Sequence, residues 1–228
     1  MLFNGFSHHA QVFLRDLQKN NNKDWFEAHR DQYENLLLIP LRKLVMDLSA
    51  CMFEIDPLLE LRPLVNKTIS RIYRDTRFSR NKDLFRTSMW IAFKRHVAVW
   101  QRIPTWFIEI SPFEYTYGMG FYEASSGTMA RFRKILCEQE ARFRELIRPL
   151  PGDPPLLAEG CFYKRKNATT DLPEELREWY MRRNLYLICH RPPGEPFYSD
   201  ALVPHLERRF RELAPLYYLL MEISADEG

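Results

Sequence analysis

The sequence predicts an α+β fold, with N-terminal, middle and C-terminal helices packed on a central, mainly antiparallel sheet. Apolar residues recur at helical spacing before residue 57 and again after residue 199, whereas short alternating segments lie between residues 67 and 119. There is no regular βαβ alternation of the kind that builds parallel sheets. With 228 residues, 46% of them apolar, the chain can bury one sizeable core. We therefore expect a single domain over residues 1–228.

The first helices are predicted from caps and apolar stripes before residue 57. Ser7 can cap the first helix, and the asparagines at 20–22 should end it. Asp24, followed by Glu27 three residues later, has the spacing of a capping box and predicts the start of a second helix. Pro40 then either kinks this helix or starts another, because proline fits a helix best in its first turn.

The sheet is predicted from short segments rich in β-branched and aromatic residues. Pro104 and Ser111-Pro112 separate several of them by short connections, which favours antiparallel pairing. The expected strands are residues 69–74, 91–99, 106–110, 113–119, 156–163 and 185–189.

The remaining helices follow the middle strands. Ser125 or Ser126 can cap a helix in the middle of the chain. Another helix is expected over residues 173–183, and a terminal helical region should begin at Ser199, limited or bent by Pro215.

The common catalytic and cofactor motifs are missing from the sequence. Gly118 and Gly120 lack the third glycine of a dinucleotide-binding loop, so we interpret them as a tight turn or bulge at a strand end. The six histidines show no ligand spacing, and the four cysteines form no Cys-x-x-Cys pair. We expect no metal site, no cofactor and reduced thiols.

Membrane and export signals are also missing from the sequence. No apolar run approaches the roughly 18 residues that span a bilayer. The first 20 residues lack the continuous apolar region of a signal peptide. A cytoplasmic protein without a membrane partner is the expectation.

The strongest charge feature lies between residues 62 and 102. This region holds eleven Lys and Arg residues and only two Asp, a local charge of +9 in a chain whose net charge is +3. The pI of about 8.6 would not by itself indicate nucleic-acid binding. The positive potential is therefore local, and it is densest over residues 71–86.

One interpretation of this cluster is structural. If residues 69–77 form a strand, neither of its faces is purely apolar, so at least one arginine should lie near the core. An unpaired charge there would cost about 3–5 kcal/mol. Carboxylates could pair with the arginines and hold the sheet in register; the candidates are Asp75, Glu109, Glu114 and Glu123. Two acids within the region cannot neutralise eleven bases.

The other interpretation is that the remaining cations bind an anion. We expect Arg71 or Arg74 to pair with Asp75, leaving Arg77 and Lys82 to contact the ligand. Charge-assisted hydrogen bonds of about 1.5–3 kcal/mol each would make such a cluster a useful binding site. Our first hypothesis is a domain that binds an anionic small molecule carrying a phosphate or a carboxylate.

Two alternatives remain open. The first is an enzyme acting on a phosphorylated or carboxylated small molecule, with Asp75 or Glu123 as general base. The second is a protein that binds the nucleic-acid backbone. Stacking on bases is one use of aromatics interleaved with cations, although aromatics at strand spacing usually belong to a core. These aromatics are Tyr73, Phe78, Phe85, Trp90, Trp100 and Trp106.

The motif Arg71-x-x-Arg74-Asp75-x-Arg77-Phe78-x-x-x-Lys82 resembles the signature of the bacterial family known as domain of unknown function 2461. Just after it, this chain has Leu84-Phe85 where the family pattern has Pro-Tyr, so a rigid turn and a hydroxyl are lost. The resemblance implies a single α+β domain and brings no established activity. The agreeing flanks are Phe13-Leu14-x-x-Leu17, Asn21-Asn22-x-x-Asp24-Trp25-Phe26, Tyr33, Gly118-x-Gly120-x-Tyr122, and Arg131 or Arg133.

Overall fold

The structure is a computed structural model, which describes residues 1–77, 80–152, 154–163 and 172–224. Its contacts divide the chain into two compact units. Unit 1 comprises Met1–Phe93, Phe107–Tyr117 and His190–Arg209, and unit 2 comprises Lys94–Trp106, Gly118–Cys189 and Phe210–Gly228.

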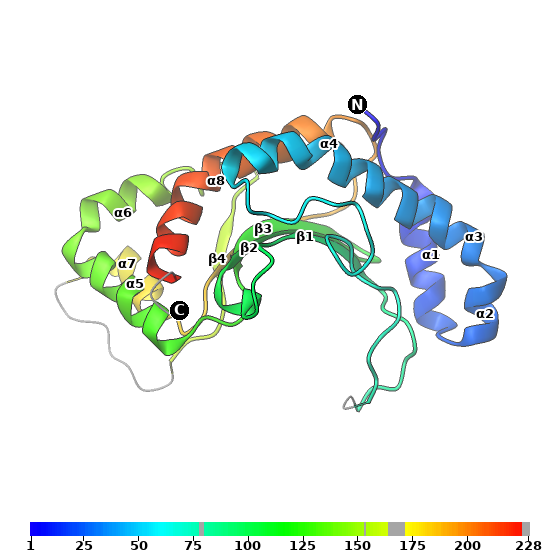
Figure 1. The fold of residues 1–228 in the computed structure, drawn as a ribbon, viewed down its shortest axis with the longest axis horizontal. Coiled ribbons are helices and arrows are strands. Elements are labelled where there is room, and N and C mark those ends of the chain that lie inside the picture. Colours follow the sequence, from blue (N-terminus) through cyan, green and yellow to red (C-terminus); the bar gives the residue numbers. More distant parts are fainter. Residues whose placement is uncertain (78–79, 153, 164–171, 225–228) are drawn as a thin grey trace. The chain divides into compact units, whose positions relative to one another are not determined.

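A five-stranded antiparallel sheet, with helices before, between and after its strands, confirms the α+β prediction (Figure 1). The strand order is β1-β2-β3-β5-β4. In the β4–β5 pair, Leu157 lies opposite Ile188 and Glu159 lies opposite Tyr186. The strands are β1 (Met89–Phe93), β2 (Pro104–Ile110), β3 (Tyr115–Phe121), β4 (Leu157–Glu159) and β5 (Tyr186–Arg191).

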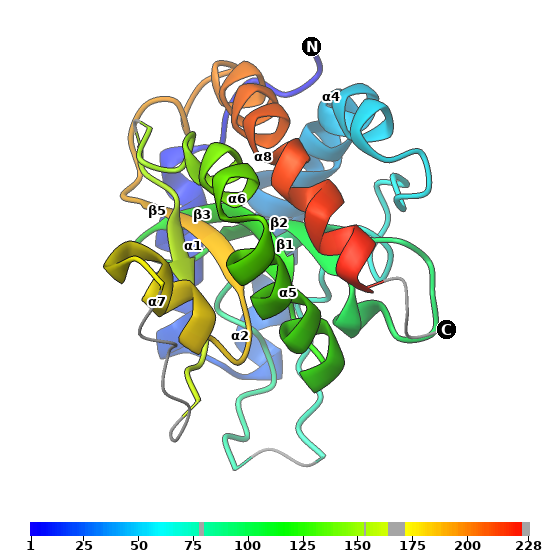
Figure 2. The ribbon, with the colours of Figure 1, turned by 90° about the vertical axis from the view of Figure 1, so that its left-hand side faces the viewer.

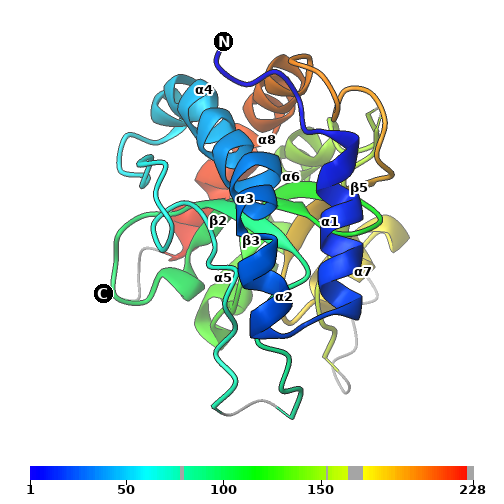
Figure 3. The same ribbon diagram turned by 90° about the vertical axis from the view of Figure 1, so that its right-hand side faces the viewer.

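The N-terminal helices belong to unit 1 (Figure 3). Ser7 caps the first by accepting a hydrogen bond from the His9 N–H, as predicted. The cap of the second is Asn22, which accepts from the Trp25 N–H, so the capping box expected at Asp24 is wrong. Pro40 lies in the first turn of a new helix, where it has no helical N–H to lose. These elements are α1 (His8–Lys19), α2 (Lys23–Ala28), α3 (Arg30–Tyr33), the π-helical turn η1 (Glu34–Leu38) and α4 (Ile39–Ile55).

Three helices of unit 2, α5, α6 and α7, are joined by aromatic contacts. Figure 2 shows their ribbons. Ser125 caps α5 by accepting from the Thr128 N–H, as predicted. The ring of Phe143 lies 5.5 Å from Phe132 and 5.2 Å from Trp179, with edge-to-face geometry in both pairs. The helical elements are the 3₁₀ turn η2 (Trp100–Arg102), α5 (Ser126–Glu138), α6 (Glu140–Ile147) and α7 (Glu174–Met181); α8 (Leu202–Ser224) has residues in both units.

Three strand predictions are wrong at least in part. The strand expected over residues 156–163 is β4, which ends at Glu159. Within the described residues, 69–74 form only isolated bridges, which are Val65–Ile69, Ile69–Ile91 and Tyr73–Phe85. The strand expected over residues 91–99 is β1, which ends at Phe93. Residues 96–99 are exposed, so their alternation has no buried face to satisfy.

The glycine pair lies inside β3, and the turn or bulge expected at a strand end is wrong. A Cβ on Gly118 would lie 1.8 Å from the Leu187 carbonyl oxygen, and one on Gly120 would lie 2.3 Å from the Tyr186 Cα. Glycine is therefore needed because the backbone of β5 approaches too closely for any side chain.

None of the helices in the described part of the chain is both long and apolar enough to span a bilayer.

Candidate functional site

The basic stretch forms a two-legged projection of unit 1, which we define as residues 69–91 and call the basic arm (Figures 1 and 3). Backbone hydrogen bonds join its legs: Ser70 N–H to Trp90 C=O at 2.9 Å, and Arg86 N–H to Ile72 C=O at 2.7 Å. A further bond runs from the Arg74 N–H to the Leu84 C=O (2.8 Å). The legs are thus held together as far as Arg74 and Leu84.

The base of the arm is fixed to the N-terminal helices by one asparagine and three rings. The Asn21 side chain donates to the Phe85 C=O at 3.0 Å and accepts from the Phe85 N–H at 2.9 Å. The Phe85 ring, 1% exposed, stacks on Phe26 at 4.2 Å and contacts Tyr73 at 4.9 Å. The anchor therefore joins residues that are 64 positions apart in the sequence.

Asp75 pairs with Arg77 near the tip. The Arg77 Nε lies 3.0 Å from Asp75 Oδ1, and Arg77 Nη2 lies 2.7 Å from Oδ2. These side-chain hydrogen bonds, followed by one from the Arg77 N–H, lower the pKa of Asp75 to about 2. The pairing expected between Asp75 and Arg71 or Arg74 is wrong; the Arg74 guanidinium instead lies 3.8 Å from a carboxylate oxygen of Asp83.

Four of the six cations of the arm are exposed to solvent, and Arg74 and Arg86 are half-buried. The Arg77 side chain is 77% exposed, Arg71 and Lys82 are exposed, and Arg74 is 25% exposed. Lys82 Nζ donates to the Thr76 C=O at 3.1 Å, so it folds back over the tip. The prediction of an arginine near the core is wrong for Arg71 and Arg77, whereas Arg74 is half-buried. Phe78 of the motif lies outside the described residues.

Buried arginines occur outside the basic arm, and no sequence pattern identified them as core residues. They are Arg133, Arg182 and Arg209. In unit 2, Arg133 donates from Nε to the Tyr180 C=O at 3.0 Å and from Nη2 to the Arg182 C=O at 3.2 Å. It thereby satisfies carbonyls at the C-terminal end of α7, a structural role.

The acids proposed to support the cluster form none of the ion pairs described above for its arginines, which are made with Asp75 and Asp83. In unit 1, Glu114 pairs with His190 at 3.1 Å. Glu109 is half-buried on β2, and no described residue forms an ion pair with it. Glu123 is an exposed residue of unit 2, where it lines an open hollow of about 480 Å³ with Arg102 and residues 124–127.

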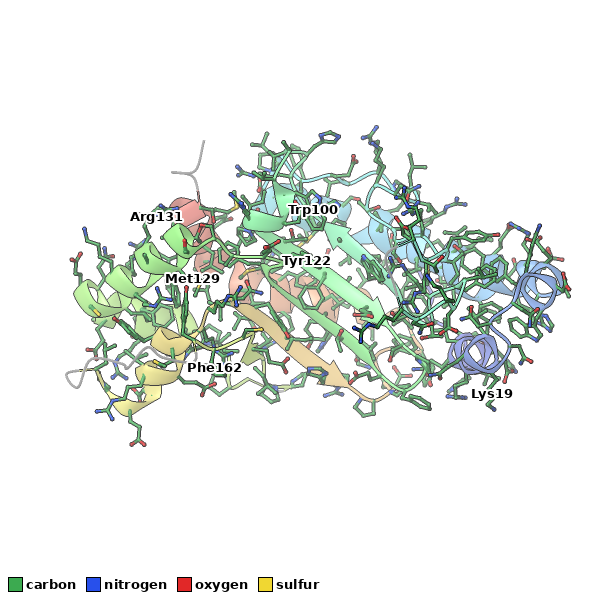
Figure 4. All side chains as sticks on the ribbon, turned by 90° about the horizontal axis from the view of Figure 1, so that it is seen from below. Lys19, Trp100, Tyr122, Met129, Arg131 and Phe162 are labelled. Carbon is green, nitrogen blue, oxygen red and sulfur yellow. The ribbon has the colours of Figure 1, made fainter. Side chains whose placement is uncertain are left out.

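Beside this hollow, Trp100 and Tyr122 bring their rings together, with centroids 5.7 Å apart (Figure 4). The Glu123 N–H donates to the Gln101 C=O at 2.9 Å, which joins η2 to the end of β3. The two rings are far apart in the sequence, and no local pattern indicated that they would meet.

A second hollow of about 480 Å³ in unit 2 is lined by Glu159, Cys161, Arg182 and Tyr186, among others. The Tyr186 hydroxyl donates to Glu159 Oε2 at 3.2 Å. Burial and then the neighbouring Glu159 carboxylate raise the pKa of Tyr186. In the described part of the chain, no group of three His, Cys, Asp or Glu side chains is placed to hold a metal ion.

Comparison with known proteins gives one match. The sequence profile of a family described as Conserved hypothetical protein (DUF2461) matches residues 9–218 of the 228. No curated protein and no solved structure matches the chain. The match spans α1, the basic arm, the sheet and most of α8.

Proposed function

The chain belongs to the DUF2461 family of conserved hypothetical proteins, and we propose that it binds an anionic partner through the basic arm. The observation that carries this proposal is the display of Arg71, Arg77 and Lys82 to solvent on the arm. The acids of the arm are Asp75 and Asp83, too few to balance its six Lys and Arg residues. The arm therefore keeps a net positive charge that attracts anions.

An extended polyanion fits this arrangement better than an enclosed small molecule. The hollows described above are lined by residues outside the arm, so they do not enclose its cations. A projecting pair of legs can instead contact successive phosphates, as proteins that neutralise a nucleic-acid backbone do. Anchoring at Asn21 and Phe85 holds the legs in place before binding, which reduces the entropy lost on association.

The enzyme alternative is less well supported by the arm. The guanidinium of Arg77 lowers the pKa of Asp75 to about 2, which makes this carboxylate a weak general base at neutral pH. The other proposed base, Glu123, belongs to unit 2. Binding without catalysis is the simpler use of these residues.

The test is fluorescence anisotropy with a labelled DNA strand of about 12 nucleotides, single-stranded and as a duplex, between about 50 and 200 mM salt. Affinity should fall as salt rises. The triple variant Arg71→Gln/Arg77→Gln/Lys82→Gln should flatten the single-strand salt slope by about 2, since each phosphate contact contributes roughly 0.7.

The matched control is Arg30→Gln/Arg62→Gln/Arg148→Gln. It removes the same charge from side chains that are 44%, 59% and 76% exposed outside the arm. Equal slopes in the two triple variants would show that binding depends on net charge alone. Binding of inorganic phosphate or citrate without binding of DNA would assign a small-molecule ligand to the arm, and binding of none of these probes would refute the proposal.

A further inference from the structure

The ring pair Trp100 and Tyr122, which we call the aromatic platform, is an exposed surface of unit 2 (Figure 4). Tyr122 is 73% exposed, and Trp100 is half-buried. Lys94 Nζ lies 3.8 Å from the centroid of the Trp100 ring, within cation–π distance. A tyrosine this exposed contributes little to a core, so its position calls for another explanation.

The backbone that carries Tyr122 is fixed. The Asn184 side chain donates to the C=O groups of Phe121 and Tyr122, both at 3.3 Å, and accepts from the Ala124 N–H at 2.9 Å. On the other side of the ring pair, the Glu123 N–H donates to the Gln101 C=O. The platform is therefore held in place before any ligand arrives, which limits the entropy cost of binding.

The segment that carries Trp100 is cationic. Residues 94–102 contain Lys94, Arg95 and Arg102 and no acid, and Glu123 is the acid that follows Tyr122. Arg102 is exposed on the same 3₁₀ turn as Trp100 and lines the neighbouring open hollow. An open aromatic ring beside cations matches a ligand that has both flat apolar faces and negative charge.

We infer that the aromatic platform stacks unpaired bases of single-stranded nucleic acid, while Arg102 contacts the adjoining backbone phosphates. Aromatic side chains interleaved with cations bind single strands without strong sequence preference, because every base has a stacking face. A duplex keeps its bases stacked on one another and cannot use the platform in this way. All the residues involved belong to unit 2, so the inference does not depend on the function proposed for the basic arm.

The test compares labelled oligothymidine of about 12 nucleotides with an abasic strand of the same length and charge. The full chain should bind oligothymidine at least about fivefold more tightly, since stacking of one base changes affinity by roughly 5- to 150-fold. Tyr122→Leu should remove most of this preference and leave binding of the abasic strand unchanged. Tyr122→Phe keeps the ring and should retain the preference.

Phe113→Leu is the matched control, because Phe113 is an aromatic residue of unit 1 that is 67% exposed. It should leave the preference intact. If the arm also binds these strands, the Arg71→Gln/Arg77→Gln/Lys82→Gln variant should lower the affinity for both by the same factor. The arm and the platform can therefore fail independently in this test.

Equal affinity of the wild-type protein for the two strands would overturn the inference. So would a Tyr122→Leu effect no larger than that of Phe113→Leu. Circular dichroism of each variant checks its fold. Tyr122 is chosen for substitution rather than the half-buried Trp100, because replacing a largely exposed side chain should leave the fold intact.

Discussion

Removing the Asn21 side chain should loosen the base of the basic arm. This amide makes two hydrogen bonds to the backbone of a single residue, Phe85, one as donor and one as acceptor. In Asn21→Ala, the Phe85 N–H and C=O lose both partners beside a ring that is 1% exposed. Water can reach the half-buried Asn21 position only in part, so these groups are not fully compensated.

The expected cost follows from these two bonds. A backbone group left without a partner in a partly buried site costs about 1–3 kcal/mol. Taking the lower end for each group, because solvent is close, gives a loss of about 2 kcal/mol in the free energy of unfolding. Asn21→Asp keeps the acceptor and loses the donor, so about half of this loss is expected.

Urea unfolding measures the effect. With a slope of about 2–3 kcal/mol/M, the midpoint should fall by about 0.7–1 M without a change in slope. Hydrogen exchange of the Phe85 amide should also become faster in Asn21→Ala. Asn35→Ala is the matched control, because the exposed Asn35 makes one local bond to the Asp31 C=O.

The reasoning is refuted if Asn21→Ala shifts the midpoint no more than Asn35→Ala does. An unchanged urea midpoint combined with fast hydrogen exchange at Phe85 would show instead that the two Asn21 hydrogen bonds order the arm locally without adding to global stability.

Three further predictions follow from the geometry. NMR titration should give Asp75 a pKa of about 2, and Arg77→Gln should return this pKa toward 3.8. Because the pKa is lowered in the folded state, the stability that this ion pair adds is complete above about pH 3.8. It is lost as the pH falls through about 2. Gly118→Ala should lower the free energy of unfolding, measured by thermal unfolding, by about 3 kcal/mol or more, because the new Cβ would meet the β5 backbone. Gly194→Ala is the control, because no atom lies within 4 Å of its Cβ position, and it should change stability by less than about 0.5 kcal/mol. Arg133→Met should cost about 2–3 kcal/mol by leaving carbonyls at the end of α7 without a donor, and a chemical-denaturation midpoint equal to wild type would contradict that structural role.

The sequence predicted well those features that depend on neighbours along the chain. Caps at Ser7 and Ser125 begin α1 and α5, since a cap needs only a side chain and amides two or three residues away. The first turn of α4 at Pro40 and the strands β2 and β3 were likewise readable from local chemistry and alternation. The single domain expected over the whole chain stays a prediction.

The predictions that failed concern contacts between distant residues. Arg71 and Arg77, two of the arginines considered for a place near the core, are exposed on the basic arm, which Asn21 and Phe26 anchor through Phe85. The glycines expected in a turn lie inside β3, where the β5 backbone comes too close for a side chain.

What the sequence alone determined is therefore the α+β class, the helix starts and the local surplus of positive charge, all of which arise from residues within a few positions of one another. Only the tertiary structure decided that Asp75 pairs with Arg77, that the arm is anchored at Asn21, and that Trp100 meets Tyr122. The physical reason is that several partners compete for each side chain. Which one it meets depends on how the whole backbone folds, and no single stretch of sequence contains that information.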